Sequence, residues 1–481
     1  MIPQPPEGIA DFAAAELPRI LWVELTSKCP FDCIFCSRRL RRGAGEHLDF
    51  EVYKSLMREL EGPEIIRLNY SGESLHYPYL IQAIELARAT GAQTELVSAF
   101  STAPDSLIEE LVRSGLDRLT ISLHTMRADQ FEEIYRFGSL ADLRSRVSRL
   151  MEIKRDFGSR TPQLDFAFVA MRANLGELSS VASYARETEV HEISVLPVIR
   201  RDPIPFEFRD ELKGGELRES FKEELEQAVA LARHVARGVN IRICSPEMEP
   251  EHCLGPRPRS FPGILPPGAM IRSCEQNPWE TVHVLADGSV VLCEVQDRVV
   301  LGNLHRQSLR EIWLGAGYRA LRRRYVVGGL AECVSCPWKL AYVPSELQPG
   351  VAALESPSSQ LFRGWHERDD SGTLWSKKEA VVLLASGAGA GKVRLAGALP
   401  PSTDGGDNDL EVSCNGVVLG RVVNPTNARI GFDACFDGLP RTGGPLTFAL
   451  RTRTAFEPGR AGVEGDLREL GFALFRIELI E

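Results

Sequence analysis

Short apolar runs typical of strands alternate with longer amphipathic stretches typical of helices from Arg19 to about Cys244. This alternation predicts an α/β fold with a parallel sheet covered by helices, because parallel strands need long crossover connections. The predicted strands cover residues 20–25, 65–70, 94–98, 118–124, 164–171, 192–199 and 239–244. The predicted helices cover residues 50–60, 79–90, 105–114, 140–157, 175–187 and 217–237. Six such units form a partial (β/α)6 barrel, whose chemistry is expected at the carboxyl ends of the strands.

Three cysteines follow the first predicted strand at CxxxCxxC spacing: Cys29, Cys33 and Cys36. Three thiolates on one short loop can bind three corners of a cubane iron–sulfur cluster, which leaves the fourth iron open to a small molecule. A structural zinc site would need a fourth protein ligand close by. After this loop the next cysteine is Cys244, and His47 is the only nearby imidazole. The spacing therefore favours an iron–sulfur cluster, with zinc as the alternative.

Length and composition limit the chain further. Its 481 residues exceed one ordinary domain and predict two or three. A net charge of −10 disfavours a nucleic-acid partner, and no apolar run approaches the length that spans a bilayer. The amino terminus shows no basic region followed by an apolar core, so no signal peptide is expected. We therefore expect a cytoplasmic protein with reduced thiols and with neither a nucleic-acid nor a membrane partner.

The cysteine loop, with Phe35 directly before its third cysteine, resembles the signature of the radical S-adenosylmethionine (radical SAM) superfamily. The resemblance implies a TIM-like partial barrel in which a 4Fe–4S cluster binds SAM through its open iron. It also implies that the reduced cluster cleaves SAM to give a 5′-deoxyadenosyl radical, which takes a hydrogen atom from a substrate. Such an enzyme needs a low-potential electron donor of the flavodoxin or ferredoxin type.

The turn after the second predicted strand, Ser71-Gly72-Glu73, resembles the Gly-Gly-Glu turn of the same superfamily, with serine in place of the first glycine. In that turn, backbone and a carboxylate hold the ammonium group of the cofactor. A glycine lets the backbone approach a ligand closely, and Glu73 supplies a charge complementary to the ammonium group. The resemblance therefore implies that this turn binds SAM, as does Phe35.

The fourth predicted strand places Thr120, Ser122 and His124 on one face, which suits a barrel lumen that holds a cofactor. The resemblance implies that Ser122 contacts the ribose hydroxyls and that His124 contacts cofactor or substrate. A lone histidine at this position could equally be structural. Asn174, after the fifth strand, matches a position that often contacts the cofactor in related enzymes, although it could simply cap the next helix.

The last predicted barrel strand places Asn240, Arg242 and Cys244 on the lumen face and apolar residues on the other face. Cys244 would then point inward at the active end of the strand, and Cys253 follows on the next loop. Either thiol could return a hydrogen atom to a substrate radical, so both are candidate catalytic residues. The alternative for Cys244 is an inert buried thiol, since free cysteines are often buried.

A second group of cysteines comprises Cys274, Cys293, Cys333 and Cys336, and an Asp-Gly hairpin at 287–288 lies among them. This order resembles the twitch or SPASM extensions of radical SAM enzymes, which bind auxiliary 4Fe–4S clusters. Four cysteines suit the shorter twitch form with one fully ligated cluster, whose implied role is electron transfer. The same four ligands would also suit zinc.

Composition divides the chain into an extension at 1–18, the barrel at 19–250, the cluster domain at 251–343, a linker at 344–362 and a tail at 363–481. The tail has short strand-like runs with Gly and Asn turns, which predict an all-β sandwich. These strands cover residues 380–385, 392–398, 409–414, 417–423, 434–438, 446–451 and 472–479. The tail resembles the jelly-roll modules of some sugar-modifying enzymes, and the alternative is a packing or dimerisation module.

Three fates are open to the substrate radical. A thiol donor gives epimerisation, whereas loss of a proton and an electron turns an alcohol into a ketone, with the auxiliary cluster accepting the electron. The third fate is modification of a peptide, but about eighteen residues before the first strand are too few for the peptide-binding module that many such enzymes carry. We therefore expect a sugar or glycoside substrate. The two spare thiols favour an epimerase of natural-product, antibiotic or glycan biosynthesis over a dehydrogenase.

Overall fold

The chain forms two compact units, which are described separately. The barrel unit comprises Glu16–Glu249 and Pro278–Tyr318, and the sandwich unit comprises Met1–Ala15, Pro250–Asn277 and Arg319–Glu481. The computed structural model describes residues 17–38, 43–198, 219–244, 268–274, 276, 278–294, 299–326, 329–334, 336, 339–352, 360–366, 372–386, 390–402, 406–441, 445–456, 458 and 470–481.

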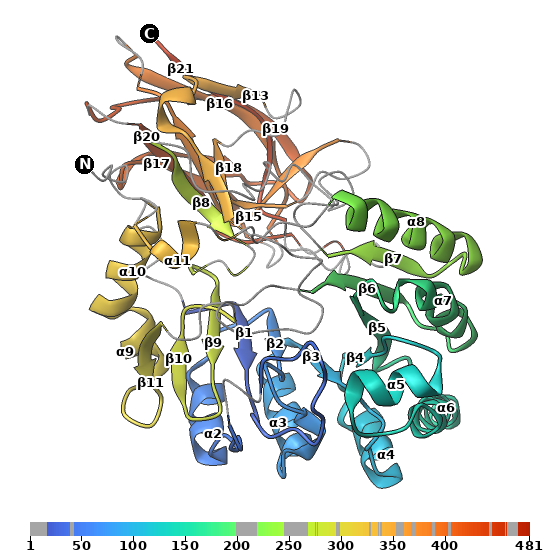
Figure 1. Cartoon of the computed structure of the whole chain (residues 1–481). Helices are drawn as coiled ribbons and strands as arrows, with labels where there is room; N and C mark the ends of the chain where they lie inside the picture. The colour runs from blue at the N-terminus through green and yellow to red at the C-terminus, as the bar shows by residue number, and fades with distance from the viewer. Residues whose placement is uncertain are drawn as a thin grey trace. The chain divides into compact units, whose positions relative to one another are not determined.

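Seven parallel strands stand in sequence order in the barrel unit, as the alternation predicts (Figure 1). They are β1 (Ile20–Val23), β2 (Ile65–Arg67), β3 (Gln93–Ser98), β4 (Arg118–Ser122), β5 (Gln163–Ala170), β6 (Glu192–Pro197) and β7 (Asn240–Ile243). Each neighbouring pair is parallel. The carboxyl ends of all seven strands therefore meet at one edge of the sheet, where the loops after them can build a common site.

Helices connect these strands and cover one face of the sheet (Figure 1). They are α2 (Phe50–Glu59), α3 (Leu80–Ala89), α4 (Asp105–Ser114), α5 (Ala128–Tyr135), α6 (Leu140–Asp156), α7 (Leu178–Glu187) and α8 (Glu219–Val235), with the 3-10 turns η1 (Ser74–His76) and η2 (Leu175–Glu177). Helix α5 was not predicted from the sequence. It has eight residues, and the residue before it, Arg127, makes no side-chain capping hydrogen bond, so its start carries no capping signal.

Outward and inward residues alternate along the strands. On β4, Leu119 and Ile121 are fully buried on the helix-covered face, whereas Thr120 and Ser122 are half-buried on the lumen face. On β7, Ile241 is buried while Arg242 is half-buried. The predicted division into an apolar outer face and a polar lumen face is therefore present at both strands.

Three strands from the region predicted as a separate cluster domain extend the barrel sheet. They are β9 (Thr281–Val284), β10 (Ser289–Val291) and β11 (Val300–Asn303), and the helices α9 (Leu309–Trp313) and α10 (Ala316–Val326) follow. Strand β9 pairs in parallel with β1, and the predicted Asp287-Gly288 hairpin joins β9 to β10 with Gly288 at φ 79°. In the part of the chain that the structure describes, this sheet has ten strands, and the hairpin lies beside the strand that leads into the cysteine loop.

The sandwich unit contains a two-stranded antiparallel sheet of β8 (Met270–Cys274) and β12 (Lys339–Tyr342), with α11 (Ala331–Val334) and the turn η5 (Pro344–Glu346). Among the described residues, its larger sheet has nine antiparallel strands, which pack around a main apolar core and a smaller second one. They are β13 (Gly350–Ala352), β14 (Leu361–Trp365), β15 (Leu374–Leu384), β16 (Lys392–Leu399), β17 (Asn408–Cys414), β18 (Val417–Asn424), β19 (Ile430–Asp437), β20 (Leu446–Thr452) and β21 (Ala473–Ile480).

The all-β character of the tail is confirmed, whereas a jelly-roll topology stays a prediction. Asn415 and Gly416 both have positive φ, 47° and 82°, as a tight hairpin turn between β17 and β18 requires. Strand β13 pairs with β21, so this part of the predicted linker belongs to the sheet. No helix among the described residues is both long enough and apolar enough to cross a bilayer.

Candidate functional site

The loop after β1 carries the three cysteines and is anchored by the end of helix α5. The backbone N–H of Asp32 donates to the carbonyl of Tyr135 at 3.2 Å, and that of Ile34 donates to the carbonyl of Ile134 at 3.0 Å. The helix that sequence analysis missed is thus one of the elements that hold the cysteine loop.

Cys29, Cys33 and Cys36 lie on the wall of one pocket of about 170 Å³ at the carboxyl ends of the strands. The other lining residues are Phe31, Phe35, Asn69, Tyr70, Ser71, Gly72, Glu73, Val97, Ser98, Ala99, Ser122, His124 and Tyr135. Six of the seven predicted cofactor contacts are in this set, and Asn174 is not. Residues from four separate loops therefore converge on the three thiols.

Two of the three thiols, those of Cys29 and Cys33, lie in surroundings that disfavour an isolated negative charge. Burial raises the pKa of Cys29 to about 11 and that of Cys33 well above its ordinary value. The nearby Cys36 adds to both effects, because like charges repel. A bound cation reverses this balance and deprotonates coordinating thiols. The loop therefore suits metal ligation better than nucleophilic chemistry.

The turn after β2 lies directly against the cysteine loop. A Cβ atom on Gly72 would lie 2.1 Å from the carbonyl oxygen of Thr26 and 2.7 Å from that of Lys28. The backbone N–H of Glu73 donates to the same Lys28 carbonyl at 2.9 Å. Only glycine permits this approach, and the close backbone contact positions the two loops relative to each other.

Glu73 lines the pocket and also fixes its wall. Its carboxylate, which is 3% exposed, accepts hydrogen bonds from the backbone N–H groups of Ala99 at 2.8 Å and Leu75 at 3.3 Å. Burial raises the pKa of Glu73, and these hydrogen bonds partly offset that effect. Since one carboxylate joins the loops after β2 and β3, any contact with a cofactor ammonium group comes from a carboxylate that is already oriented.

Ser71 connects the pocket to the β9–β10 hairpin through Glu24, which is 1% exposed. The Ser71 hydroxyl donates to one carboxylate oxygen of Glu24, and the Ala286 N–H donates to the other at 2.9 Å. The serine that replaces the first glycine of the superfamily turn thus has its own role in this chain. It ties the turn to a buried carboxylate shared with the hairpin.

Asn69 was missed by sequence analysis, although it lies two residues before Ser71 on the side of β2 that lines the pocket. Its side-chain oxygen is buried and has no hydrogen-bond partner among the described residues. A buried acceptor without a donor is costly. Because Asn69 lines the pocket, a ligand with an N–H or O–H group there would satisfy this oxygen.

His124 is held as a neutral, buried ring. Its Nδ1 accepts from the backbone N–H of Val169 at 3.1 Å, and its ring stacks on Tyr135 with centroids 5.3 Å apart. Burial lowers its pKa to about 3. The Phe35 ring meets it edge-on at 5.0 Å. His124 therefore packs against Phe35 and helps to position it in the pocket wall. A contact of His124 with cofactor or substrate stays a prediction.

Asn174 is fully buried outside the pocket. Its amide nitrogen donates to the carbonyls of His124 and Val169, both at 3.0 Å, and its oxygen accepts from the Met171 N–H at 2.8 Å. Both polar atoms of this amide are thus bonded to backbone groups at the ends of β4 and β5. Its predicted contact with the cofactor is untested, and the hydrogen bonds favour a positioning role.

Cys244, one of the two thiols proposed as hydrogen-atom donors, is not in the pocket lining. Cys244 follows β7, the last strand at one edge of the sheet, and its backbone N–H donates to the Val195 carbonyl at 2.7 Å. Its sulfur lies 4.0 Å from the carbonyl of Arg242. Cys253 lies outside the described residues. A catalytic role for either thiol stays a prediction.

Three cysteines of the second group gather within the sandwich unit. Cys274 pairs with Lys339 across the β8–β12 ladder, and the side chain of Tyr325 contacts Cys274 and lies close to Cys333 and Cys336. The Lys339 ammonium donates to the Cys336 carbonyl at 2.9 Å. Two segments, the end of β8 and the Cys333–Cys336 stretch, thus bring these three cysteines near a buried tyrosine.

The fourth cysteine of this group, Cys293, belongs to the barrel unit, directly after β10. Its carbonyl accepts from the hydroxyl of Tyr70 at 3.2 Å, and Tyr70 lines the cofactor pocket. The Tyr70 ring also meets His283 edge-on at 6.2 Å. A pocket residue is therefore bonded directly to a predicted ligand of the auxiliary cluster.

The residues present fit the groups that the sequence implies. Three thiols on one loop leave one corner of a 4Fe–4S cluster open, Gly72 lets the backbone approach closely, and Asn69 offers an unused acceptor. The cofactors are accordingly SAM, a SAM-binding 4Fe–4S cluster and an auxiliary iron–sulfur cluster.

Comparisons with known proteins agree with this donor set. Residues 23–159 match the radical SAM superfamily, and residues 274–337 match SPASM, an iron–sulfur cluster-binding domain. These matches cover the CxxxCxxC loop and the four cysteines of the second group. They favour iron–sulfur clusters over the zinc alternatives at both places.

Curated relatives share about a fifth of their residues with the chain. PqqA peptide cyclase of Gluconobacter oxydans is 22% identical over 62% of this chain and 76% of its own. GTP 3′,8-cyclase of Chlorobaculum tepidum is 22% identical over 36% of this chain and 51% of its own. Among solved structures, SuiB of Streptococcus suis bound to S-adenosylmethionine aligns with 67% of this chain and 71% of its own, at 12% identity and a TM-score of 0.49.

Proposed function

We propose that the chain is a radical SAM enzyme that modifies a peptide, because residues 23–159 match the radical SAM superfamily and residues 274–337 match the SPASM iron–sulfur domain. The observation that carries the substrate class is the similarity to PqqA peptide cyclases, which extends over 62% of this chain in one of them. The three-cysteine pocket carries the radical chemistry.

When bound, the reduced cluster and SAM supply a radical that removes a hydrogen atom from an unreactive C–H bond. The protein positions the bound groups and limits the access of water to them. Glu73 and Gly72 fix the turn against the cysteine loop, and Asn69 offers an acceptor to the ligand. Phe35, His124 and Tyr135 form an aromatic wall that limits water around the reacting groups.

A peptide replaces the sugar that sequence analysis favoured. The sugar-epimerase reading rested on two spare thiols and on a jelly-roll tail, but Cys244 is absent from the pocket lining and the tail is established only as all-β. The named relatives do not support a carbohydrate substrate. The peptide-modifying alternative is therefore the better account.

The direct test is anaerobic reconstitution with iron and sulfide, followed by reduction with SAM and a library of synthetic peptides. Mass spectrometry would follow both 5′-deoxyadenosine and the peptide masses. We expect one or more peptides to lose hydrogen, for example two mass units on forming a cross-link, with 5′-deoxyadenosine in proportion. A parallel panel of sugars and glycosides should remain unchanged. Altered sugars with unaltered peptides would reverse the proposal.

A further inference from the structure

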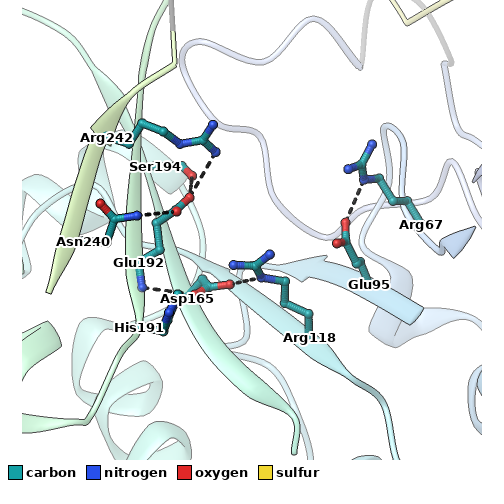
Figure 2. Close-up of polar contacts among 9 residues, drawn as sticks. All are labelled: Arg67, Glu95, Arg118, Asp165, His191, Glu192, Ser194, Asn240 and Arg242. Atoms are coloured by element: carbon teal, nitrogen blue, oxygen red, sulfur yellow. Dashed lines mark hydrogen bonds and ion pairs between the residues drawn. The ribbon is translucent and has the colours of Figure 1, made fainter. Parts of the chain in front are cut away.

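A row of side chains lies on the lumen face of the barrel sheet, and Figure 2 shows its charged members. This lumen row consists of Trp22, Arg67, Glu95, Arg118, Asp165, Glu192 and Arg242. Arg67 and Glu95 each precede, by two residues, a residue of the pocket lining, namely Asn69 and Val97. Two residues along a strand span about 7 Å and return to the same face. The lumen row therefore faces the same interior as the pocket.

Two carboxylates of the lumen row are already supplied with donors. Glu192 accepts from Ser194 and Asn240, both at 2.9 Å, and from Arg242 at 3.1 Å. Asp165 accepts from the Arg118 Nε and from the Glu192 backbone N–H, the latter at 3.1 Å. Figure 2 shows these bonds closing on the two carboxylates. Neither carboxylate is well placed to capture a cationic ligand.

Two arginines of the row use their Nε atoms to bind a neighbouring carboxylate, which leaves their terminal nitrogens for another partner. The Arg67 Nε donates to Glu95 at 2.7 Å, as the Arg118 Nε does to Asp165. In the described part of the chain, the terminal nitrogens of these two arginines make no hydrogen bond, and each side chain is 28% exposed. The paired terminal nitrogens of a guanidinium group match the two oxygens of a carboxylate. Each Nε hydrogen bond therefore orients a guanidinium group and leaves its two terminal nitrogens available to a ligand.

Trp22 adds a third donor to the same level. It stands opposite Arg67 in the β1–β2 register, and the Arg67 guanidinium lies over its ring at 4.6 Å. The indole N–H of Trp22 is buried and has no acceptor among the described residues. A buried donor of this kind is normally satisfied by a neighbour, a water or a ligand. At this end of the row, the polar groups that remain without a hydrogen-bond partner are therefore donors.

We propose that the lumen row binds a carboxylate of the substrate through the terminal nitrogens of Arg67 and Arg118. This inference rests on the proposed function and narrows it to a peptide with an acidic side chain at or next to the reacting residue. Glu95 stands between the two arginines in the strand register and holds Arg67 in place. The site therefore selects for substrate charge one layer below the pocket where the radical forms.

The test uses two mixtures of capped pentapeptides that are randomised at four positions and carry either Glu or Gln at the centre. Equilibrium dialysis would measure their binding to the reconstituted protein with SAM. We expect the wild type to prefer the Glu mixture by about tenfold or more, since a hydrogen bond to a charged group is worth roughly 1.5–3 kcal/mol. Arg67→Gln and Arg118→Gln should each remove most of that preference and leave binding of the Gln mixture unchanged.

Arg113→Gln is the matched control, because Arg113 is also tethered through Nε, to Glu109 at 2.9 Å, but on the outer surface of helix α4. It should keep the wild-type preference. Arg67→Lys keeps the charge and loses the fork, so an intermediate preference in that variant supports the proposal even if Arg67→Gln does not fold. Iron content and thermal unfolding would show which variants are folded.

A wild type without preference for the Glu mixture would overturn the inference, as would an equal loss for both mixtures in the folded arginine variants. The proposed function fails differently. If the Glu mixture binds selectively but no peptide is altered under reducing conditions, the peptide-modifying activity is wrong. If peptides are altered regardless of their acidic residues, only the carboxylate site is wrong.

Discussion

Replacing Gly72 with alanine should disable the cofactor pocket, although the change adds one methyl group. The new Cβ would lie 2.1 Å from the Thr26 carbonyl oxygen and 2.7 Å from that of Lys28, and both atoms belong to the backbone that leads into the cysteine loop. Backbone atoms cannot rotate away as a flexible side chain can. The turn after β2 and the cysteine loop must therefore separate.

The separation can be worked out from these contacts. Ordinary van der Waals contact begins at 3.4 Å, so the nearer oxygen must move by 1.3 Å relative to the turn. The hydrogen bond from the Glu73 N–H to the Lys28 carbonyl, at 2.9 Å, would break or lengthen. Overpacking of this kind costs about 1–3 kcal/mol. A displacement of about 1 Å in catalytic groups lowers turnover by roughly a hundredfold.

The assay is SAM cleavage, measured as 5′-deoxyadenosine formed by the reduced, reconstituted protein, together with SAM affinity. We expect Gly72→Ala to keep the iron content of the wild type within the error of reconstitution and to lose roughly a hundredfold in rate. Gly176→Ala is the matched control, because a Cβ at Gly176 meets no atom within 4 Å. If Gly72→Ala cleaves SAM as fast as Gly176→Ala does, the close approach of the two loops is not what builds the pocket.

Three further outcomes are expected. Tyr70→Phe removes the hydrogen bond to the Cys293 carbonyl, worth about 1 kcal/mol, so amide hydrogen exchange around Cys293 should accelerate about fivefold; an unchanged rate would refute the link. Burial lowers the pKa of His283 to about 3, so the unfolded chain binds its proton first and stability falls as pH drops below about 6.5. At pH 5 this costs about 2 kcal/mol, so thermal unfolding should show a loss between pH 7 and pH 5 that is about 2 kcal/mol smaller in His283→Phe than in the wild type, where His124 makes the same kind of contribution; an equal loss in both proteins would refute the burial of a neutral His283. Cys33→Ala should lose the iron of the SAM-binding cluster, whereas Cys414→Ala, in the sandwich core, should lose none; equal iron contents would contradict the ligand assignment.

Local patterns predicted much of the fold. Alternating strands and helices predicted seven parallel strands in order, and Asp287-Gly288 predicted the hairpin between β9 and β10. The sequence could not show that β9 pairs with β1, because strand pairing between residues 261 positions apart leaves no local pattern. It also missed helix α5, which lacks a capping residue and is short.

The candidate site was predicted where a residue's type alone dictates its chemistry. Three spaced thiols and a turn with Gly72 are recognisable in one dimension. The roles of Asn69 and Asn174 depend on which atoms remain without a partner after folding, and only the structure shows that one amide is fully used and the other is not. The tethering of Arg67 by Glu95 likewise depends on strand register.

The most direct test of the central claim is SAM cleavage by the reconstituted, reduced wild type beside Cys33→Ala. The account predicts 5′-deoxyadenosine and methionine in equal amounts from the wild type and none above background from the variant. Equal yields from both proteins, or a wild type that holds its full iron and still forms no 5′-deoxyadenosine, would contradict the account of the three-cysteine pocket.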